Sequence, residues 1–183
     1  MNEIDKLFEL LESKTDSLRY EAFKKLLAIT DKKVKWIYDK WFALVKKLSS
    51  ENSFQRSIGL LLLANLAKSD SENRFAKIID DYLLHINDEK FITARQCIQN
   101  IWRIATGLKI HEQKIIDALI GSYYENLHLK THGNLIKQDI ILSLTEIYKH
   151  NKDKKLAAVI DSFIEEENDI KLKKILSKVF QPK

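Results

Sequence analysis

A five-fold recurrence of one short pattern constrains this chain more than any other feature of its sequence. The pattern is a basic residue, followed by a small or apolar residue three positions later and a large apolar residue seven positions later. Residues at these separations share one face of an α-helix. The basic positions, which we call the basic ladder, are separated by 37, 39, 42 and 36 residues and are Arg19, Arg56, Arg95, Lys137 and Lys173.

The apolar positions of the pattern are expected in the core. Those three residues after the ladder are Ala22, Gly59, Ile98, Ile140 and Leu176, and those seven residues after it are Leu26, Leu63, Trp102, Leu144 and Phe180. Five two-helix units that each bury one face on the next are typical of an α-solenoid.

The rest of the chain agrees with long helices and short turns, because 183 residues contain one proline and four glycines. Gly107 is expected just beyond a helix end, as a C′ residue. Apolar spacing and capping residues predict ten helices and no strand. The expected ranges are 3–12, from about 16 to 29, 33–48, 54–68, a helix whose face runs from Phe75 to Leu83, 89–106, 111–128, 135–149, 154–165 and 170–180.

At the ladder residues the chain resembles the HEAT-repeat family, whose second helix carries an apolar residue, a basic residue and a small or apolar residue three on. The family's inter-helix proline is absent. The resemblance implies an all-α fold, a right-handed α-α superhelix of about five HEAT-like two-helix repeats, in a single domain over residues 1–183. The matching segments are Leu18-Arg19-x-x-Ala22, Gln55-Arg56-x-x-Gly59, Ala94-Arg95-x-x-Ile98, Ile136-Lys137-x-x-Ile140 and Leu172-Lys173-x-x-Leu176.

Two roles are open for the basic ladder. In a structural role, each cation covers the apolar stripe with its methylene groups and bonds helix-end carbonyls or carboxylates of an adjacent repeat. In a binding role, the cations form a row that holds phosphates. We favour the structural role, because a residue that shares the core face is poorly placed to reach a ligand.

A better binding candidate is the face one step further round the same helices, which in such solenoids lines the concave side. An ordinary solvated face is the alternative. In the second repeat this face holds Ser57, Leu61 and Ala64, and this break in polarity favours a protein groove over a continuous phosphate track. The candidate concave residues are Tyr20, Lys24, Gln96, Asn100, Arg103, Gln138, Lys174 and Lys178.

The aromatic residues mostly fit packing roles. Trp41 continues an apolar stripe and is expected in the core, whereas Trp36 lies among lysines and is expected to pack with partial exposure. Tyr123 and Tyr124 belong to an apolar stripe and are expected to pack between repeats.

Signals for chemistry are few. The sequence has no phosphate loop, no dinucleotide-binding glycine turn and no metal-binding pair of cysteines, so neither cofactor nor metal is expected. His128 and His132 are four residues apart, but a glycine follows directly. Cys97 is expected as a buried small residue rather than a nucleophile, and Gly59 as a site of close helix packing.

Charge and hydropathy limit the partners and the cellular compartment that we expect for this chain. The formal charge of +5 suggests a nucleic-acid partner, but lysines scattered over helices for solubility explain it at least as well, and we favour that explanation. The first residues carry acids and suggest no signal peptide, and the longest apolar run, Ile58 to Ala64, is too short to span a membrane. We therefore expect a cytoplasmic monomer.

We expect a non-enzymatic binding or scaffold module that holds a protein or peptide on its concave face. The alternative is a nucleic-acid-binding protein, or a repair enzyme similar to the DNA glycosylases built from HEAT-like repeats. Those enzymes carry a tryptophan and an aspartate in the groove, and no tryptophan here has an aspartate four residues on. Asp139, expected at the polar edge of a helix, is the nearest available carboxylate.

Overall fold

A computed structural model describes residues 2–125 and 133–182. This part of the chain is all-helical, with ten α-helices, four short 3₁₀ segments and no strand. The α-helices are α1 (Glu3–Leu10), α2 (Asp16–Thr30), α3 (Ile37–Leu48), α4 (Ser53–Leu66), α5 (Ile79–Leu84), α6 (Phe91–Gly107), α7 (Glu112–Glu125), α8 (Gly133–Asn151), α9 (Lys154–Glu165) and α10 (Ile170–Val179). The 3₁₀ segments are η1 (Ala67–Ser69), η2 (Arg74–Lys77), η3 (His85–Asn87) and η4 (Lys109–His111).

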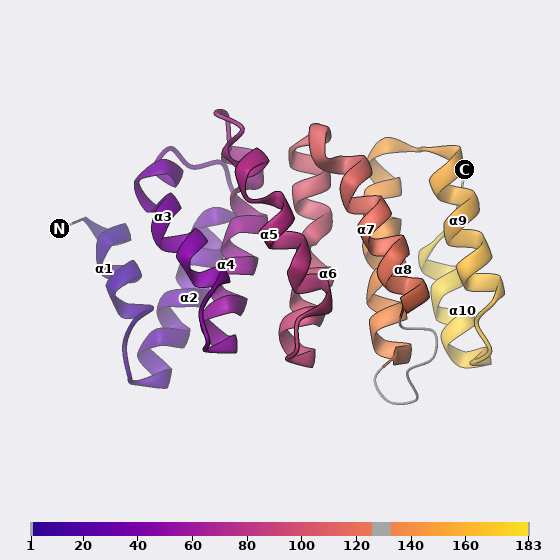
Figure 1. The fold of residues 1–183 in the computed structure, drawn as a ribbon, viewed down its shortest axis with the longest axis horizontal. Helices are drawn as coiled ribbons and strands as arrows, with labels where there is room; N and C mark the ends of the chain where they lie inside the picture. Colours follow the sequence, from indigo (N-terminus) through magenta and orange to yellow (C-terminus); the bar gives the residue numbers. More distant parts are fainter. Residues whose placement is uncertain (1, 126–132, 183) are drawn as a thin grey trace.

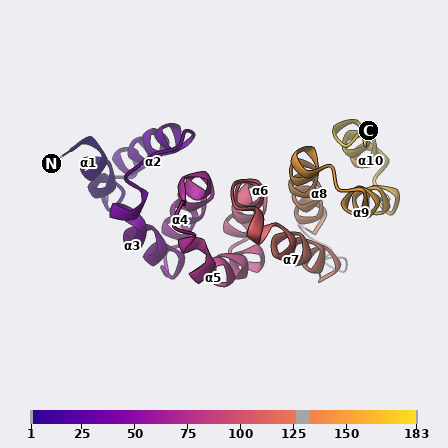
Figure 2. The ribbon, with the colours of Figure 1, turned by 90° about the horizontal axis from the view of Figure 1, so that it is seen from above.

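The helices lie in two curved rows, one inside the other (Figure 2). Helices α2, α4, α6, α8 and α10 form the inner row, on the concave side, and helices α1, α3, α5, α7 and α9 form the outer row. Each inner helix packs against the next inner helix along the row. The inner helices all begin at one edge and end at the other, which we call the lower and upper edges as in Figure 1.

Side-chain caps fix where several helices begin. The carboxylate of Asp169 accepts hydrogen bonds from the backbone N–H groups of Lys171 and Leu172 at α10, and Asp153 does the same for α9. Asn52 caps α4 by accepting from Phe54 N at 2.9 Å. Such caps satisfy N–H groups that have no partner within the helix.

The expected core positions are buried with one exception. The nine positions other than Trp102 are closed to solvent. Trp102 is half-buried on α6, and its indole N–H donates to the carbonyl of Gln99 at 3.1 Å. An indole needs a partner for its N–H, and here a carbonyl of its own helix supplies one at the surface. The expectation of a core Trp102 was therefore wrong.

The helix expected from Phe75 to Leu83 is broken into the 3₁₀ segment η2 and the short helix α5. Asn73 adopts a left-handed conformation with φ of 53°, and Ile78, between η2 and α5, has φ of −126°. The carboxylate of Asp70 accepts from the backbone N–H of Phe75 and the hydroxyl of Tyr38, which ties the loop to α3. A side chain that offers the backbone such bonds competes with helix formation.

Gly107 does not end α6 in the expected way. It is the last residue of the helix, and no described glycine has a positive φ. A Cβ atom at this position would lie 3.1 Å from the backbone nitrogen of Lys68. Glycine is therefore needed here because the backbone of η1 passes close by.

The remaining aromatic residues follow the packing expectations in most cases. Trp41 is buried with its ring edge-on to Phe75, and half-buried Trp36 lies edge-on to Phe8. Tyr123 stacks on Phe163 of α9 with ring centroids 3.7 Å apart, whereas Tyr124 is half exposed.

Candidate functional site

The strongest ladder contact joins Arg56 on α4 to Asp88, which precedes α6. Two guanidinium nitrogens donate to the two carboxylate oxygens, each at 2.8 Å, and a third donates to the carbonyls of Ser50 and Glu51. The two side chains are only 8% and 3% exposed. Burial alone would raise the pKa of Asp88, but hydrogen bonds from Arg56, the Lys90 backbone and His85 lower it to about 2.

The other ladder cations make related contacts. Arg19 and Lys173, like Arg56, donate to carbonyls of the lower-edge segment before their own helix, those of Ser13 and Glu165. Lys137 lies 4.0 Å from Glu167, a buried carboxylate at the next turn. Their hydrogen-bonding capacity is thus directed into the fold rather than outward.

Asp139 is not at a polar edge, contrary to expectation. Its side chain is 4% exposed and accepts hydrogen bonds from Arg95 at 2.5 and 3.1 Å and from Gln99 at 3.0 Å. The sequence suggested a solvated carboxylate, but the ladder cation of the preceding repeat covers it. Asp139 therefore does not face the inner surface as a free acid.

The candidate concave residues lie on four inner helices and differ in exposure. On α2, Tyr20 and Lys24 are exposed and contact each other, with the ammonium 4.9 Å from the ring centre, and Lys24 pairs with Glu21. Lys174 and Lys178 are exposed on α10. The residues at the two ends of the row are therefore open to solvent.

In the middle of the row the candidates are half-buried. This applies to Gln96, Asn100 and Arg103 on α6 and to Gln138 on α8. Only Gln96 and Asn100 are joined directly, by a hydrogen bond from the Asn100 amide to the Gln96 carbonyl at 2.9 Å. Close packing of α4, α6 and α8 explains the difference from the ends, because each of these helices has an inner neighbour on both sides.

A hollow of about 390 Å³ opens between the first turns of α4 and α6. Phe54 and Phe91 lie in its walls, together with Ser57 and the exposed Ile92. Gln96 borders the hollow, and its side-chain oxygen is buried without a hydrogen-bond partner within the described residues. The lining of the hollow also includes polar and charged residues, among them Glu89, Lys90 and Thr93. A hollow with aromatic walls, a mixed polar lining and one polar group that lacks a partner is a typical ligand-binding feature.

Further up α6, Arg103 covers Trp102. The guanidinium carbon lies 4.7 Å from the ring centre, and the Arg103 Nε is buried without a partner in the described part of the chain. The ring of His150, on α8, lies 6.1 Å from that of Trp102. This cluster links α6 to α8 on the inner row.

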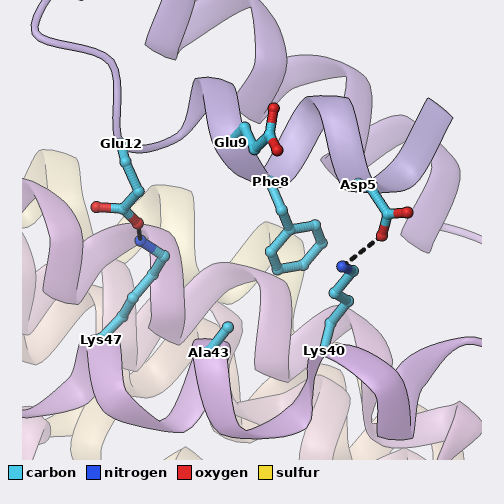
Figure 3. A pocket seen from close by; sticks show the side chains of 7 residues that line it. All are labelled: Asp5, Phe8, Glu9, Glu12, Lys40, Ala43 and Lys47. Atoms are coloured by element: carbon cyan, nitrogen blue, oxygen red, sulfur yellow. Dashed lines mark hydrogen bonds and ion pairs between the residues drawn. The ribbon is translucent and has the colours of Figure 1, made fainter. Parts of the chain in front are cut away.

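A second hollow lies in the outer row, between α1 and α3 (Figure 3). Two ion pairs close its ends, Lys40 with Asp5 at 2.6 Å and Lys47 with Glu12, and Phe8 lies between them. Since the charges that line this hollow mostly pair with each other, we interpret it as a helix–helix contact.

Of the remaining candidates, Cys97 is fully buried, burial raises the pKa of its thiol, and its Sγ lies 3.8 Å from the Tyr82 carbonyl. His128 and His132 lie outside the described residues. Among residues 2–125 and 133–182, no three His, Cys, Asp or Glu side chains group as metal ligands.

Sequence reasoning missed the aromatic walls of the hollow and the acidic partners of the ladder. The sequence contained signals for both. Phe54 lies two residues before Arg56, and Phe91 lies four residues before Arg95. Asp88 lies seven residues before Arg95, and Glu167 lies six residues before Lys173. Glu167 is buried although it ends a run of three glutamates, which in a sequence is typical of a solvated face.

No family model matches the chain, and no curated protein matches it. Two crystal structures of engineered proteins, both Northeast Structural Genomics Consortium targets, are similar to it. One has 20% identity and a TM-score of 0.59 over 98% of this chain and 80% of its own. The other has 19% identity and a TM-score of 0.61 over 98% of this chain and 78% of its own. At these identities the likeness concerns the fold alone, an all-helical and repeat-like one.

Among the described residues, no helix has both the length and the apolar character that crossing a bilayer requires.

Proposed function

We propose that this protein is a HEAT-like solenoid, a right-handed superhelix of five two-helix repeats, that binds an extended peptide segment of a partner protein on its inner row. The observation that carries the proposal is the hollow between α4 and α6, with aromatic walls and the partnerless oxygen of Gln96 at its border. An N–H group of a bound backbone would give that oxygen a hydrogen-bond donor, and an apolar side chain would fill the hollow.

Exposed apolar side chains also lie near the starts of the inner helices on either side of the hollow. Ile92 of the hollow is 60% exposed, and Tyr20 on α2 and Leu135 on α8 are 51% and 39% exposed. Exposed apolar residues that line up across neighbouring elements mark an interaction surface more strongly than isolated ones. An extended peptide that crosses the inner helices would contact them in turn.

Selection of peptides tests this proposal. Random peptides displayed on phage would be selected on the immobilised protein, and the affinities of enriched sequences measured by titration. We expect Ile92→Glu to weaken their binding at least about tenfold, because a charge would enter the apolar surface.

Phe42→Glu is the matched control, because Phe42 is 82% exposed on α3 of the outer row. It should leave the affinity unchanged. If the selected peptides bind the Ile92→Glu protein as tightly as the original protein, the inner row is not the binding surface. The same conclusion follows if Phe42→Glu reduces their affinity as much as Ile92→Glu does. A double variant extends the test to the polar positions. It combines Lys24→Glu, at one end of the inner row, with Arg103→Glu, in its middle.

A further inference from the structure

The two edges of the double row carry opposite charge. At the upper edge, residues 31–36, 68–77, 109–114 and 149–155 contain twelve lysines and arginines and five carboxylates, a formal charge of +7. At the lower edge, residues 9–16, 49–53, 85–90 and 165–171 contain ten carboxylates and three lysines, a formal charge of −7. Although the net charge of the chain is modest, its positive and negative charges are strongly separated between the two edges.

Within the described residues, five of the ten lower-edge carboxylates form ion pairs, namely Glu12, Asp16, Asp88, Glu89 and Glu167, whereas most of the upper-edge cations form none. Asp16, Asp88 and Glu167 pair with ladder cations, and Glu12 pairs with Lys47. Seven upper-edge lysines are exposed and form no ion pair within residues 2–125 and 133–182. They are Lys32, Lys33, Lys35, Lys77, Lys109, Lys154 and Lys155.

Helix electrostatics account for Lys32 and Lys33, which follow the C-terminal end of α2, but not for several of the other lysines. Cations stabilise the C-terminal ends of helices and are disfavoured at the N-terminal ends. Lys154 and Lys155 are the first two residues of α9, Lys35 lies two residues before α3, and Lys109 precedes α7. Several of the lysines without partners therefore occupy positions that local helix stability disfavours.

We propose that the upper edge binds the phosphate backbone of double-stranded nucleic acid. Neighbouring helices pack about 10 Å apart, so the four upper-edge segments extend over about 30 Å, or roughly nine base pairs. Exposed lysines that extend from separate loops contact phosphates without reading sequence. This surface is distinct from the inner row proposed above for peptides.

The aromatic residues near the edge favour a duplex over a single strand. Single strands are held by stacking bases on open aromatic faces. Here Arg74 lies over Tyr38 at 4.2 Å, Lys152 over the buried Tyr148 at 5.2 Å, and Arg103 over Trp102 at 4.7 Å. These rings are covered by cations and half-buried Trp36 packs edge-on against Phe8, so the edge offers charge rather than open stacking platforms.

Fluorescence anisotropy with a labelled duplex of about 20 base pairs, at about 50 and 200 mM salt, tests the proposal. The upper-edge variant replaces Lys32, Lys33, Lys154 and Lys155 by Gln. The matched control replaces four exposed lysines elsewhere, Lys6, Lys14, Lys25 and Lys46, by Gln and so has the same net charge. All eight positions are at the surface, so both variants should fold, which circular dichroism checks.

We expect the original protein to lose affinity steeply with salt. The upper-edge variant should bind at least about tenfold more weakly at the lower salt. The slope of the logarithm of its binding constant against the logarithm of the salt concentration should be shallower by about 2 to 4, since each phosphate contact contributes about 1 to that slope. The control should stay within about twofold. Equal loss in both variants would mean that net charge alone attracts DNA and would overturn the proposal.

Two further binding measurements distinguish a duplex from other anionic partners. A single strand of the same length should bind more weakly than the duplex, and vesicles that contain anionic lipid should not bind at protein concentrations that saturate the duplex. Tighter binding to the single strand, or binding to vesicles without binding to duplex, would each overturn the assignment. Loss of duplex binding leaves the peptide proposal untouched, because that test uses other residues and another ligand.

Discussion

Arg56 and Asp88 form a two-bond ion pair that joins the second repeat to the third at the lower edge. Both hydrogen bonds measure 2.8 Å, and neither side chain is more than 8% exposed. Arg56 also donates hydrogen bonds to two backbone carbonyls of the turn before α4. The cation of one repeat thereby fixes both its own turn and the turn of its neighbour.

The first prediction concerns the stability that this pair supplies. Arg56→Met keeps the apolar stem but leaves the Asp88 carboxylate buried without its charge partner. Breaking a buried pair from one side costs about 3 to 5 kcal/mol, and the neighbouring His85 should reduce this to about 2 to 4 kcal/mol. Urea unfolding followed by circular dichroism measures the change.

Lys68→Met is the control, because Lys68 is half-buried and, within the described residues, donates only to the carbonyl of Asp31. Its cost should stay below about 1 kcal/mol. Equal unfolding midpoints for the two variants would contradict the structural role of the basic ladder.

The second prediction is a pH dependence that Asp88 produces. Its pKa is about 2 in the folded protein and near 3.8 when unperturbed. The unfolded chain therefore binds a proton at a higher pH than the folded protein, and stability falls as the pH drops from about 4 towards 2. The difference of nearly two pKa units corresponds to about 2 kcal/mol.

Asp88→Asn isolates this contribution. The variant is expected to be less stable near neutral pH, where Arg56 loses its charge partner, but to lose about 2 kcal/mol less between pH 4 and pH 2 than the original protein. Parallel stability curves for the two proteins over this range would rule out Asp88 as the source.

Much of the fold follows from the sequence because the ladder positions serve one purpose in every repeat. The residue three positions after each cation faces the core in all five units, so Ile98 and Ile140 are as deeply buried as Ala22. Helix starts were also predictable where a cap is local: the helix expected over 170–180 begins at Ile170, directly after the capping residue Asp169. Such signals depend on neighbours within a few residues.

The failures involve contacts between distant residues. The break in the segment before α6 depends on Tyr38, which lies 32 residues from Asp70 and binds its carboxylate. Asp139 was misplaced because its partner Arg95 lies 44 residues earlier. The hollow was missed for the same reason, since its walls come from α4 and α6. Spacing along the chain does not show which surfaces meet.

The third prediction concerns Cys97, whose thiol is fully enclosed and whose pKa is raised by burial. Thiol reagents attack the thiolate, so the folded protein should react only through opening of the structure. Labelling with a chromogenic disulfide should be slow without denaturant and complete within minutes in urea. Rapid stoichiometric labelling of the folded protein would contradict the buried position.

The last prediction contrasts two helical glycines. At Gly59 on α4, an added Cβ atom would lie 2.9 Å from the Lys47 Cβ and 3.2 Å from the Leu44 carbonyl oxygen. Both atoms belong to α3, so Gly59→Ala would force the two helices apart, a strain that costs about 1 to 3 kcal/mol. Alanine gains about 1 kcal/mol over glycine in a helix interior, so the net destabilisation expected from this strain is up to about 2 kcal/mol.

Gly121 provides the matched comparison, because it is exposed in α7 and an added Cβ would meet nothing within 4 Å. Gly121→Ala should therefore stabilise the protein by about 0.5 to 1 kcal/mol. Urea unfolding of both variants under one set of conditions measures the two changes. Shifts of the same sign would mean that α3 and α4 do not approach as closely as the structure shows, since helix propensity alone favours alanine at both positions.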